Sequence, residues 1–394
     1  MKIPQSLYNF KGSSDVSIII GENGSGKSTL LNDIARHYSY DKTLEVVAIA
    51  NSIHDKFSIR SKNFNALRGR QGRKQAKIAI KNAIKNIAEK DMQRLKFASM
   101  ALEYVGFDPR IGFKVPKLKT KDIHGMIDRS YDLPESEKGE ILYESSHLSE
   151  SDRKDIFYLC ERIERLQGKE KIWLSMDKYS FESIRDYSLT ELFVLERKLI
   201  NLKIIDPIEV YLSKDDNEIS LLEASSGELS LITSIVYLST IIEHNTVILI
   251  DEPENSLHPK WQKEYVKNLL DIFYLYEPKI IIATHSPTIL NGAEVDIQDI
   301  DIYLSKDFEI TKKRKDSQNI EESYYNFFGI ITPENRFLSN LITEKINDLA
   351  EKEITRDQFN EFITALEETI YDKRQEKLIE AVVKIANKIR ITGS

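Results

Sequence analysis

The sequence predicts an α/β fold in which a mixed, mainly parallel sheet is interrupted by a helical insertion and followed by a helical appendage. Three short apolar runs predict the sheet: residues 15–20 (DVSIII), 246–251 (TVILID) and 279–284 (KIIIAT). Their near-continuous β-branched residues and leucine are typical of parallel strands that are buried on both faces. Polar or glycine-rich residues follow each run, so the strand ends predict a functional site.

The first strand leads into the glycine-rich stretch GENGSGKST, which begins at Gly21, and then into a helical pattern. The spacing of Gly21, Gly24, Gly26, Lys27 and Ser28 matches G-x-x-x-x-G-K-[ST], in which backbone N–H groups converge on phosphate oxygens at a helix N-terminus. We expect Lys27 to bridge the β- and γ-phosphates of ATP and Ser28 to hold Mg²⁺. The predicted nucleotide-binding residues of this loop are Asn23, Gly24, Ser25, Gly26, Lys27, Ser28 and Thr29.

The second strand ends in two neighbouring carboxylates, Asp251 and Glu252. Asp251 suits water-mediated coordination of Mg²⁺, and Glu252 suits polarising the water that attacks the γ-phosphate. Without the glycine-rich loop, a solvated turn would explain two acids at a strand end equally well. With the loop present, we predict that Glu252 is catalytic and that Asp251 joins Ser28 as a metal ligand.

A further helix begins about 20 residues before that strand, in the stretch ASSGE that starts at Ala224. Small residues leave the amide groups of a helix N-terminus open, so a γ-phosphate could dock there. Serine and glycine are also ordinary residues at a helix start, and the position relative to the acidic strand favours the phosphate interpretation. The predicted phosphate contacts are Ser225, Ser226, Gly227 and Glu228.

The third strand ends beside His285, in the stretch KIIIATHSP. We predict that His285 donates a hydrogen bond to the γ-phosphate and so senses hydrolysis. The alternative is a polar residue that simply ends a strand.

Taken in order, these motifs resemble those of ABC-type ATPase heads of the SMC, RecF and OLD families, over about a hundred residues. The resemblance implies an ABC-ATPase head in which two chains pack head to tail around two ATP molecules. Ser225 and Gly227 of one chain would then complete the site built on Lys27 of the other. The same resemblance assigns the catalytic roles to Glu252 and His285.

The chain departs from the family pattern at three places. His258 stands where many heads have an aspartate, and Ala224 replaces a leucine. Asn51 and Ser52 follow the strand predicted over residues 44–50, where a glutamine is usual. The missing glutamine, the helical insertion and the lack of an apolar run of about 20 residues argue against a transporter subunit. We expect a cytoplasmic protein without a membrane segment.

We divide the chain into an N-terminal part of the head (1–53), an insertion lobe (54–205), a C-terminal part of the head (206–305) and an appendage (306–394). Apolar residues at helical spacing predict a compact, mainly helical insertion. Proline and glycine interrupt it too often for an extended coiled coil. The single cysteine, Cys160, is expected in the core and excludes a disulfide framework.

Residues 56–85 contain ten Lys or Arg and no Asp or Glu, although the whole chain has a net charge of −7. Such a segment can follow the phosphodiester backbone of DNA or RNA without reading bases. Several of its lysines also fit the solvated face of a helix. Both interpretations stay open from the sequence.

The appendage has apolar stripes that predict three helices, the first beginning near Thr332. These helices either close on one another or offer a docking surface to a partner chain. Asp299 and Asp301 form a D-x-D pattern like that of the metal site of OLD nucleases, but no matching glutamate strand precedes them. We expect these two residues to lie in a loop and the chain not to be a nuclease itself.

Three further stretches, ANSIHDKF, ALRGRQGRK and GIITPENRF, resemble the ATPase subunit of Septu-type anti-phage systems and their retron-associated relatives. This resemblance implies an ATPase that dimerises, assembles further and regulates an HNH-type nuclease partner. The alternatives are a RecF-like or OLD-like DNA-repair ATPase without a dedicated nuclease, and a nucleotide-binding scaffold with little turnover.

Overall fold

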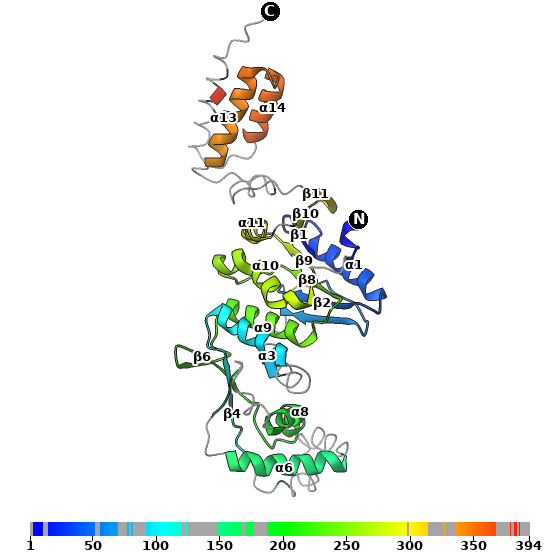
Figure 1. Ribbon diagram of the computed structural model, residues 1–394, viewed down its shortest axis with the longest axis vertical. Helices are drawn as coiled ribbons and strands as arrows, with labels where there is room; N and C mark the ends of the chain where they lie inside the picture. Colours follow the sequence, from blue (N-terminus) through cyan, green and yellow to red (C-terminus); the bar gives the residue numbers. More distant parts are fainter. Residues whose placement is uncertain are drawn as a thin grey trace, which may run out of the picture.

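A seven-stranded sheet forms the centre of the head, in the order β11-β10-β1-β9-β8-β2-β3 (Figure 1). All neighbouring strands are parallel except β10 and β11, which form an antiparallel hairpin at one edge. The mixed, mainly parallel sheet is therefore confirmed. Its strands are β1 (Asp15–Ile20), β2 (Glu45–Ala50), β3 (Phe64–Arg68), β8 (Thr246–Asp251), β9 (Lys279–Thr284), β10 (Ile300–Lys306) and β11 (Glu309–Lys313).

The computed structural model describes most of the head and parts of the remaining chain. The described residues are 3–10, 15–51, 56–69, 77–78, 80–81, 92–119, 123, 149–166, 171–175, 187–297, 299–313, 327, 336–367, 379, 382–383 and 386.

Helices cover both faces of the head sheet, which explains why its central strands β1, β9, β8 and β2 are largely apolar and buried. Ile18 and Ile20 of β1 belong to one hydrophobic core, and Ile19 between them belongs to the other. One core contains α1, and the other contains α9, α10 and α11. These helices are α1 (Lys27–Tyr40), α9 (Ser226–Ile241), α10 (Pro259–Phe273) and α11 (Pro287–Asp296), with short 3-10 turns η1 (Gln5–Leu7) and η4 (Tyr274–Tyr276).

A second, antiparallel sheet lies beyond the head, in the order β5-β4-β6-β7. This sheet was not predicted from the sequence, because each strand has only four or five residues. Apolar residues do alternate in β4, at Ile111 and Phe113, although Gly112 between them is buried as well. The strands are β4 (Arg110–Lys114), β5 (Lys171–Ser175), β6 (Val210–Lys214) and β7 (Asn217–Ser220).

The strand pairing also corrects three of the predicted domain boundaries. Strand β3 was assigned to the insertion but pairs with β2 in the head, whereas β6 and β7 were assigned to the head but form a sheet with β4. The predicted boundary at residue 305 cuts the β10–β11 hairpin. Asp301 lies in β10 rather than in a loop, with its Oδ1 atom 2.6 Å from Lys312 Nζ. The pairing of strands defines these domain boundaries, and the sequence alone does not show which strands pair.

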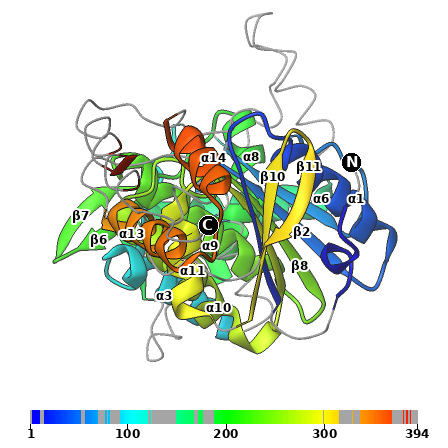
Figure 2. The same cartoon turned by 90° about the horizontal axis from the view of Figure 1, so that it is seen from above.

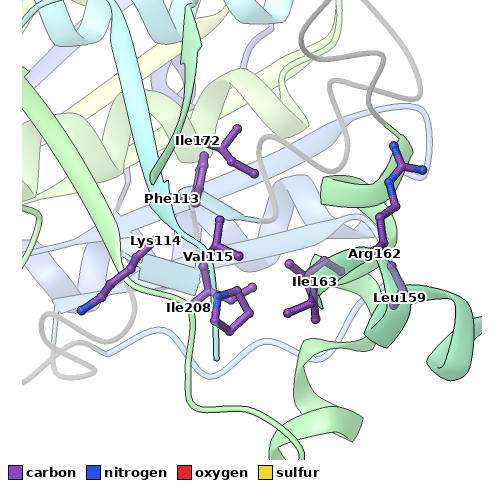
Figure 3. Close-up of a pocket in the computed structure, with 10 residues that line it drawn as sticks. Phe113, Lys114, Val115, Leu159, Arg162, Ile163, Ile172 and Ile208 are labelled. Carbon is purple, nitrogen blue, oxygen red and sulfur yellow. The ribbon is translucent and has the colours of Figure 1, made fainter. Parts of the chain in front are cut away.

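Two helices of the insertion, α6 (Glu150–Leu166) and α8 (Tyr187–Asn201), confirm part of the predicted helical lobe. Ser149 caps α6, since its Oγ atom accepts from the N–H of Asp152 at 3.0 Å. Cys160 is buried and free, as expected. The gap between β4 and α6 is apolar and holds about 20 Å³, room for one water molecule, so we interpret it as a packing defect (Figure 3).

Helix α3 (Met92–Val105) connects the insertion with the head by packing against α9. The buried guanidinium of Arg94 donates to the carbonyl oxygens of Ser239 at 2.8 Å and of Ile242 at 3.2 Å, and it pairs with Glu243 at 2.6 Å. Arg94 therefore satisfies carbonyl groups at the C-terminal end of α9, which would otherwise lack partners.

We expect Arg94→Met to lower the free energy of unfolding by about 2 kcal/mol, because it leaves buried carbonyl groups without a donor. Urea denaturation followed by circular dichroism measures this change. Lys267→Met, which removes an exposed ion pair with Asp271, serves as the control and should stay within about 0.5 kcal/mol. Equal stability of the two variants would contradict the capping role of Arg94.

The appendage contains α13 (Arg336–Glu351) and α14 (Arg356–Glu367). Their apolar residues form a core separate from both cores of the head, together with Ile379, Val382 and Ala386. This favours the interpretation in which the helices close on one another. Thr332 and the start of the first predicted helix lie outside the described residues. Within the described residues, no helix is both long and apolar enough to cross a membrane.

Candidate functional site

The three predicted motif strands lie side by side in the centre of the sheet. Ile20 of β1 pairs with Thr284 of β9, and Asp251 of β8 pairs with Ala283 of β9. Since the strands are parallel, their carboxyl ends meet at one edge, where ligands of such sheets bind. Residues separated by more than two hundred positions in the sequence therefore lie together at this edge.

The glycine-rich loop connects β1 with α1 and depends on its glycines. Gly24 and Gly26 have φ angles of 85° and 99°, which favour glycine, and Gly26 is the N-cap of α1. A Cβ atom on Gly21 would lie only 2.2 Å from the carbonyl oxygen of Ser305. The loop thus has the shape that brings backbone N–H groups together at the start of a helix.

Lys27 lies inside this loop. Its Nζ atom donates to the carbonyl oxygens of Gly21 and Glu22, both at 2.8 Å, and its side chain is buried. Burial lowers the pKa of Lys27, while Glu252 and other nearby acids act in the opposite direction. The ammonium group is therefore positioned at the centre of the loop, where phosphate oxygens would bind.

Ser28 and Asp251 form the candidate metal site. The Ser28 hydroxyl donates to Asp251 Oδ1 at 3.1 Å, and Oδ2 of this buried carboxylate has no hydrogen-bond partner among the described residues. Burial raises the pKa of Asp251 to about 6, and the neighbouring Glu252 adds to this increase. A hydroxyl and a carboxylate with an oxygen to spare suit Mg²⁺, which prefers oxygen ligands and would favour the charged carboxylate.

Glu252 follows β8 in a left-handed conformation, with φ of 51°. An L-residue gains no stability from this conformation, which costs about 1–2 kcal/mol, and such residues concentrate at active sites. The Glu252 carboxylate accepts a hydrogen bond from Asn255 Nδ2 at 3.0 Å, and its backbone N–H donates to Ala283 at 2.9 Å. Asn255, which the sequence analysis did not select, thus orients the predicted catalytic acid.

His285 has a partner that the sequence analysis also missed, Glu254. The Glu254 Oε1 atom lies 3.0 Å from His285 Nδ1 and accepts from the backbone N–H of His285 at 2.6 Å. Nδ1 has no aligned hydrogen-bond partner among the described residues, so it is the negative charge of the nearby Glu254 carboxylate, rather than a hydrogen bond, that favours a proton on Nδ1. The Glu254 side chain is only 5% exposed, whereas that of His285 is 35% exposed. The signal in the sequence was an acid three residues after Asp251, in DEPE.

The predicted phosphate contacts at Ser225 lie at the start of α9, as expected. Ser225 and Glu228 form a capping box, with Glu228 N–H to Ser225 Oγ at 3.3 Å and Ser225 N–H to Glu228 Oε2 at 2.8 Å. Ser225 and Ser226 are exposed. Gly227 is buried, and a Cβ atom there would lie 2.4 Å from the carbonyl oxygen of Ser256. Its direct role is therefore close packing against the loop that follows Glu252.

Two residues at which the chain departs from the family pattern, His258 and Asn51, form hydrogen bonds within the head. His258 is the N-cap of α10, and its Nδ1 atom accepts from the N–H of Lys260 at 3.2 Å. Asn51 donates through its backbone to the carbonyl oxygen of Asp251 at 3.2 Å, so it lies beside the candidate metal site. Ser52 lies outside the described residues.

Some basic side chains of residues 56–85 form hydrogen bonds or ion pairs within the protein. Arg68 donates to the carbonyl oxygen of Phe57 at 2.8 Å, and Lys81 forms a buried ion pair with Glu196. Burial also lowers the pKa of Lys77. The arginines and lysines of residues 70–76 lie outside the described residues, and the contact with nucleic acid stays a prediction.

Residues 16–291 match the model of the family described as "AAA domain, putative AbiEii toxin, Type IV TA system". Protein ea59 of Escherichia phage lambda is 25% identical over 290 residues, which cover 72% of this chain but 47% of ea59. The chain therefore spans about half the length of that relative. Retron Vc95 probable ATPase of Vibrio cholerae serotype O1 biovar El Tor is 25% identical over 371 residues, 72% of this chain and 70% of its own. Retron Ec83 probable ATPase of Escherichia coli is 31% identical over 105 residues, 24% of this chain and 19% of its own.

Two solved structures show weaker likeness. An inward-facing metal-chelate type ABC transporter has a TM-score of 0.30 and 12% identity, covering 81% of this chain and 80% of its own. The Smc head domain from Pyrococcus furiosus, bound to the C-terminal domain of ScpA, has a TM-score of 0.22 and 17% identity, covering 61% and 56%. The fold is defined instead by the strand order and by the family match.

Proposed function

Because the chain belongs to the AAA domain family whose model it matches, we propose that it is an ATPase that binds ATP and Mg²⁺ at the carboxyl edge of the head sheet. One observation carries this proposal: the sheet brings Lys27, the Ser28–Asp251 pair and Glu252 to the same edge. The names of the two retron relatives, both probable ATPases, support the same activity.

Each side chain has a separate role in this proposal. Lys27 binds the β- and γ-phosphates, and Ser28 and Asp251 hold Mg²⁺, which neutralises the charge of the phosphate oxygens. Glu252, oriented by Asn255, polarises the attacking water. His285 donates from Nε2 to the γ-phosphate, since the Glu254 carboxylate lies beside Nδ1.

We expect Lys27→Ala to weaken the binding of Mg·ATP about 30-fold. The variant removes a charge-assisted hydrogen bond worth about 2 kcal/mol, and each 1.4 kcal/mol corresponds to a tenfold change. Isothermal titration calorimetry measures the dissociation constant. Lys267→Ala removes an exposed lysine of α10 and should leave the affinity unchanged. Unchanged binding in Lys27→Ala would reject the glycine-rich loop as the nucleotide site.

We further propose that two chains pack head to tail, so that the start of α9 in one chain faces the nucleotide of the other. The exposure of Ser225 and Ser226 at a helix N-terminus supports this arrangement, because the Ser226 N–H group and the hydroxyl groups of both serines can reach a ligand outside their own chain. Gly227 packs on Ser256, so closure around ATP would be transmitted to the loop beside Glu252.

At the level of biology, we propose a subunit of an anti-phage defence complex that regulates an HNH-type nuclease. The retron ATPases among the relatives support this context. Purification of the natively expressed protein tests it, because a smaller metal-dependent nuclease should copurify. A stable ATPase without such a companion would favour the RecF-like or OLD-like repair function instead, and the absence of steady-state turnover would favour a scaffold. Binding of DNA or RNA through residues 56–85 belongs to the same proposal.

A further inference from the structure

The turn of the β10–β11 hairpin carries an exposed phenylalanine where a glycine is usual. Lys306 pairs with Glu309, which leaves Asp307 and Phe308 as a two-residue turn, with φ angles of 49° and 62°. Turns with two positive φ angles favour asparagine or aspartate followed by glycine. A bulky residue with this conformation is an outlier, and Phe308 is 57% exposed. Neither the backbone conformation nor packing against the rest of the protein explains why a phenylalanine stands at position 308.

The hairpin is held directly against the glycine-rich loop. The carbonyl oxygen of Ser25 accepts from the Ser305 hydroxyl at 2.9 Å and from the backbone N–H of Phe308 at 3.3 Å. Gly21 approaches the carbonyl oxygen of Ser305 so closely that only glycine fits. Phe308 therefore lies at the rim of the phosphate-binding loop, fixed by contacts on both sides of the turn.

The order of the strands indicates which end of a nucleotide would meet this turn. β9, which ends beside His285, and β8, which ends at Asp251, lie on one side of β1, and the β10–β11 hairpin lies on the other side (Figure 1). Figure 2 shows the hairpin of β10 and β11 from above. The γ-phosphate and Mg²⁺ belong on the side of Asp251. A nucleotide that crosses the loop then extends its base toward the hairpin.

We propose that the ring of Phe308 stacks on the base of the bound nucleotide. This inference rests on the proposed nucleotide binding and adds a base-contact site to it. Every base offers a π-face, so the contact contributes affinity without selecting strongly among bases. It also accounts for a strained, exposed aromatic residue, since such strain is retained where it serves a ligand.

The test compares ATP with inorganic tripolyphosphate, which lacks ribose and base, in titration calorimetry with Mg²⁺. Phe308→Gly removes the ring while it suits the positive φ angle, so the variant should fold at least as well as the wild-type protein. We expect it to bind ATP about 10-fold more weakly and tripolyphosphate within about twofold of wild type. Phe308→Trp should retain the wild-type affinity for ATP. Tyr40→Ala removes an exposed aromatic residue at the far end of α1, about 20 Å away, and should change neither affinity.

Unchanged ATP affinity in Phe308→Gly would overturn the proposal. An equal loss for ATP and tripolyphosphate would also overturn it, because the turn would then only shape the phosphate loop. If the wild-type protein bound neither compound, the proposed nucleotide function would fail and this inference with it.

Discussion

Glu252→Gln is expected to lower kcat for ATP hydrolysis about 1000-fold and to leave the affinity for Mg·ATP within about twofold of wild type. The amide keeps the size of the side chain and its contact with Asn255, but it cannot polarise water as a carboxylate does. Loss of an interaction made mainly in the transition state lowers kcat and leaves ground-state binding. Steady-state phosphate release and titration calorimetry measure the two quantities.

The same variant tests the head-to-tail dimer, because ATP that is bound but not hydrolysed should hold two chains together. Light scattering after size-exclusion chromatography should show a dimer of Glu252→Gln with ATP and a smaller species without it. Glu277→Gln is the matched control: Glu277 has the same left-handed backbone, with φ of 45°, but precedes β9 at the opposite end of the sheet. Full ATP turnover in Glu252→Gln would reject its catalytic role.

The sequence was sufficient to predict the centre of the head and most of the candidate site. Strands buried on both faces leave continuous apolar runs, and the positive φ angles of Gly24 and Gly26 follow directly from a motif that requires glycine. The helix start at Ser225 and the pairing of Ser28 with Asp251 could also be predicted from the sequence, because each depends on residue types at a fixed spacing within a motif.

The features that the sequence did not reveal depend on strand partners and on contacts between distant residues. The short strand β4 is defined by pairing with β5 and β6, each distant from it in the chain. The contact between the β10–β11 hairpin and Ser25 joins residues 280 positions apart. The sequence shows that residue 254 is a glutamate, but only the fold places its carboxylate next to His285.

Glu254→Gln is expected to lower kcat about 100-fold with KM within about threefold of wild type. Glutamine can still accept from the backbone N–H of His285, but it carries no charge to hold the proton on Nδ1. His285 would then lose the orientation in which Nε2 faces the γ-phosphate, and losses of this size are typical of groups that orient a catalytic partner. Phosphate-release kinetics give kcat and KM, and ¹⁵N chemical shifts of the His285 ring report which nitrogen carries the proton.

A double-mutant cycle distinguishes this positioning role from a general effect on the loop. If Glu254 acts through His285, then Glu254→Gln should lower kcat only slightly in a variant whose His285 has already been replaced by alanine, because the two changes remove the same interaction. Independent action would make the two losses multiply, and an unchanged Nδ1 proton in Glu254→Gln would contradict the role directly. A rise in KM alone would instead assign Glu254 to the electrostatics of Lys27, whose pKa is lowered by burial while the charge of Glu254 acts against this decrease. The cycle thus separates a residue that positions the switch histidine from one that only holds the nucleotide.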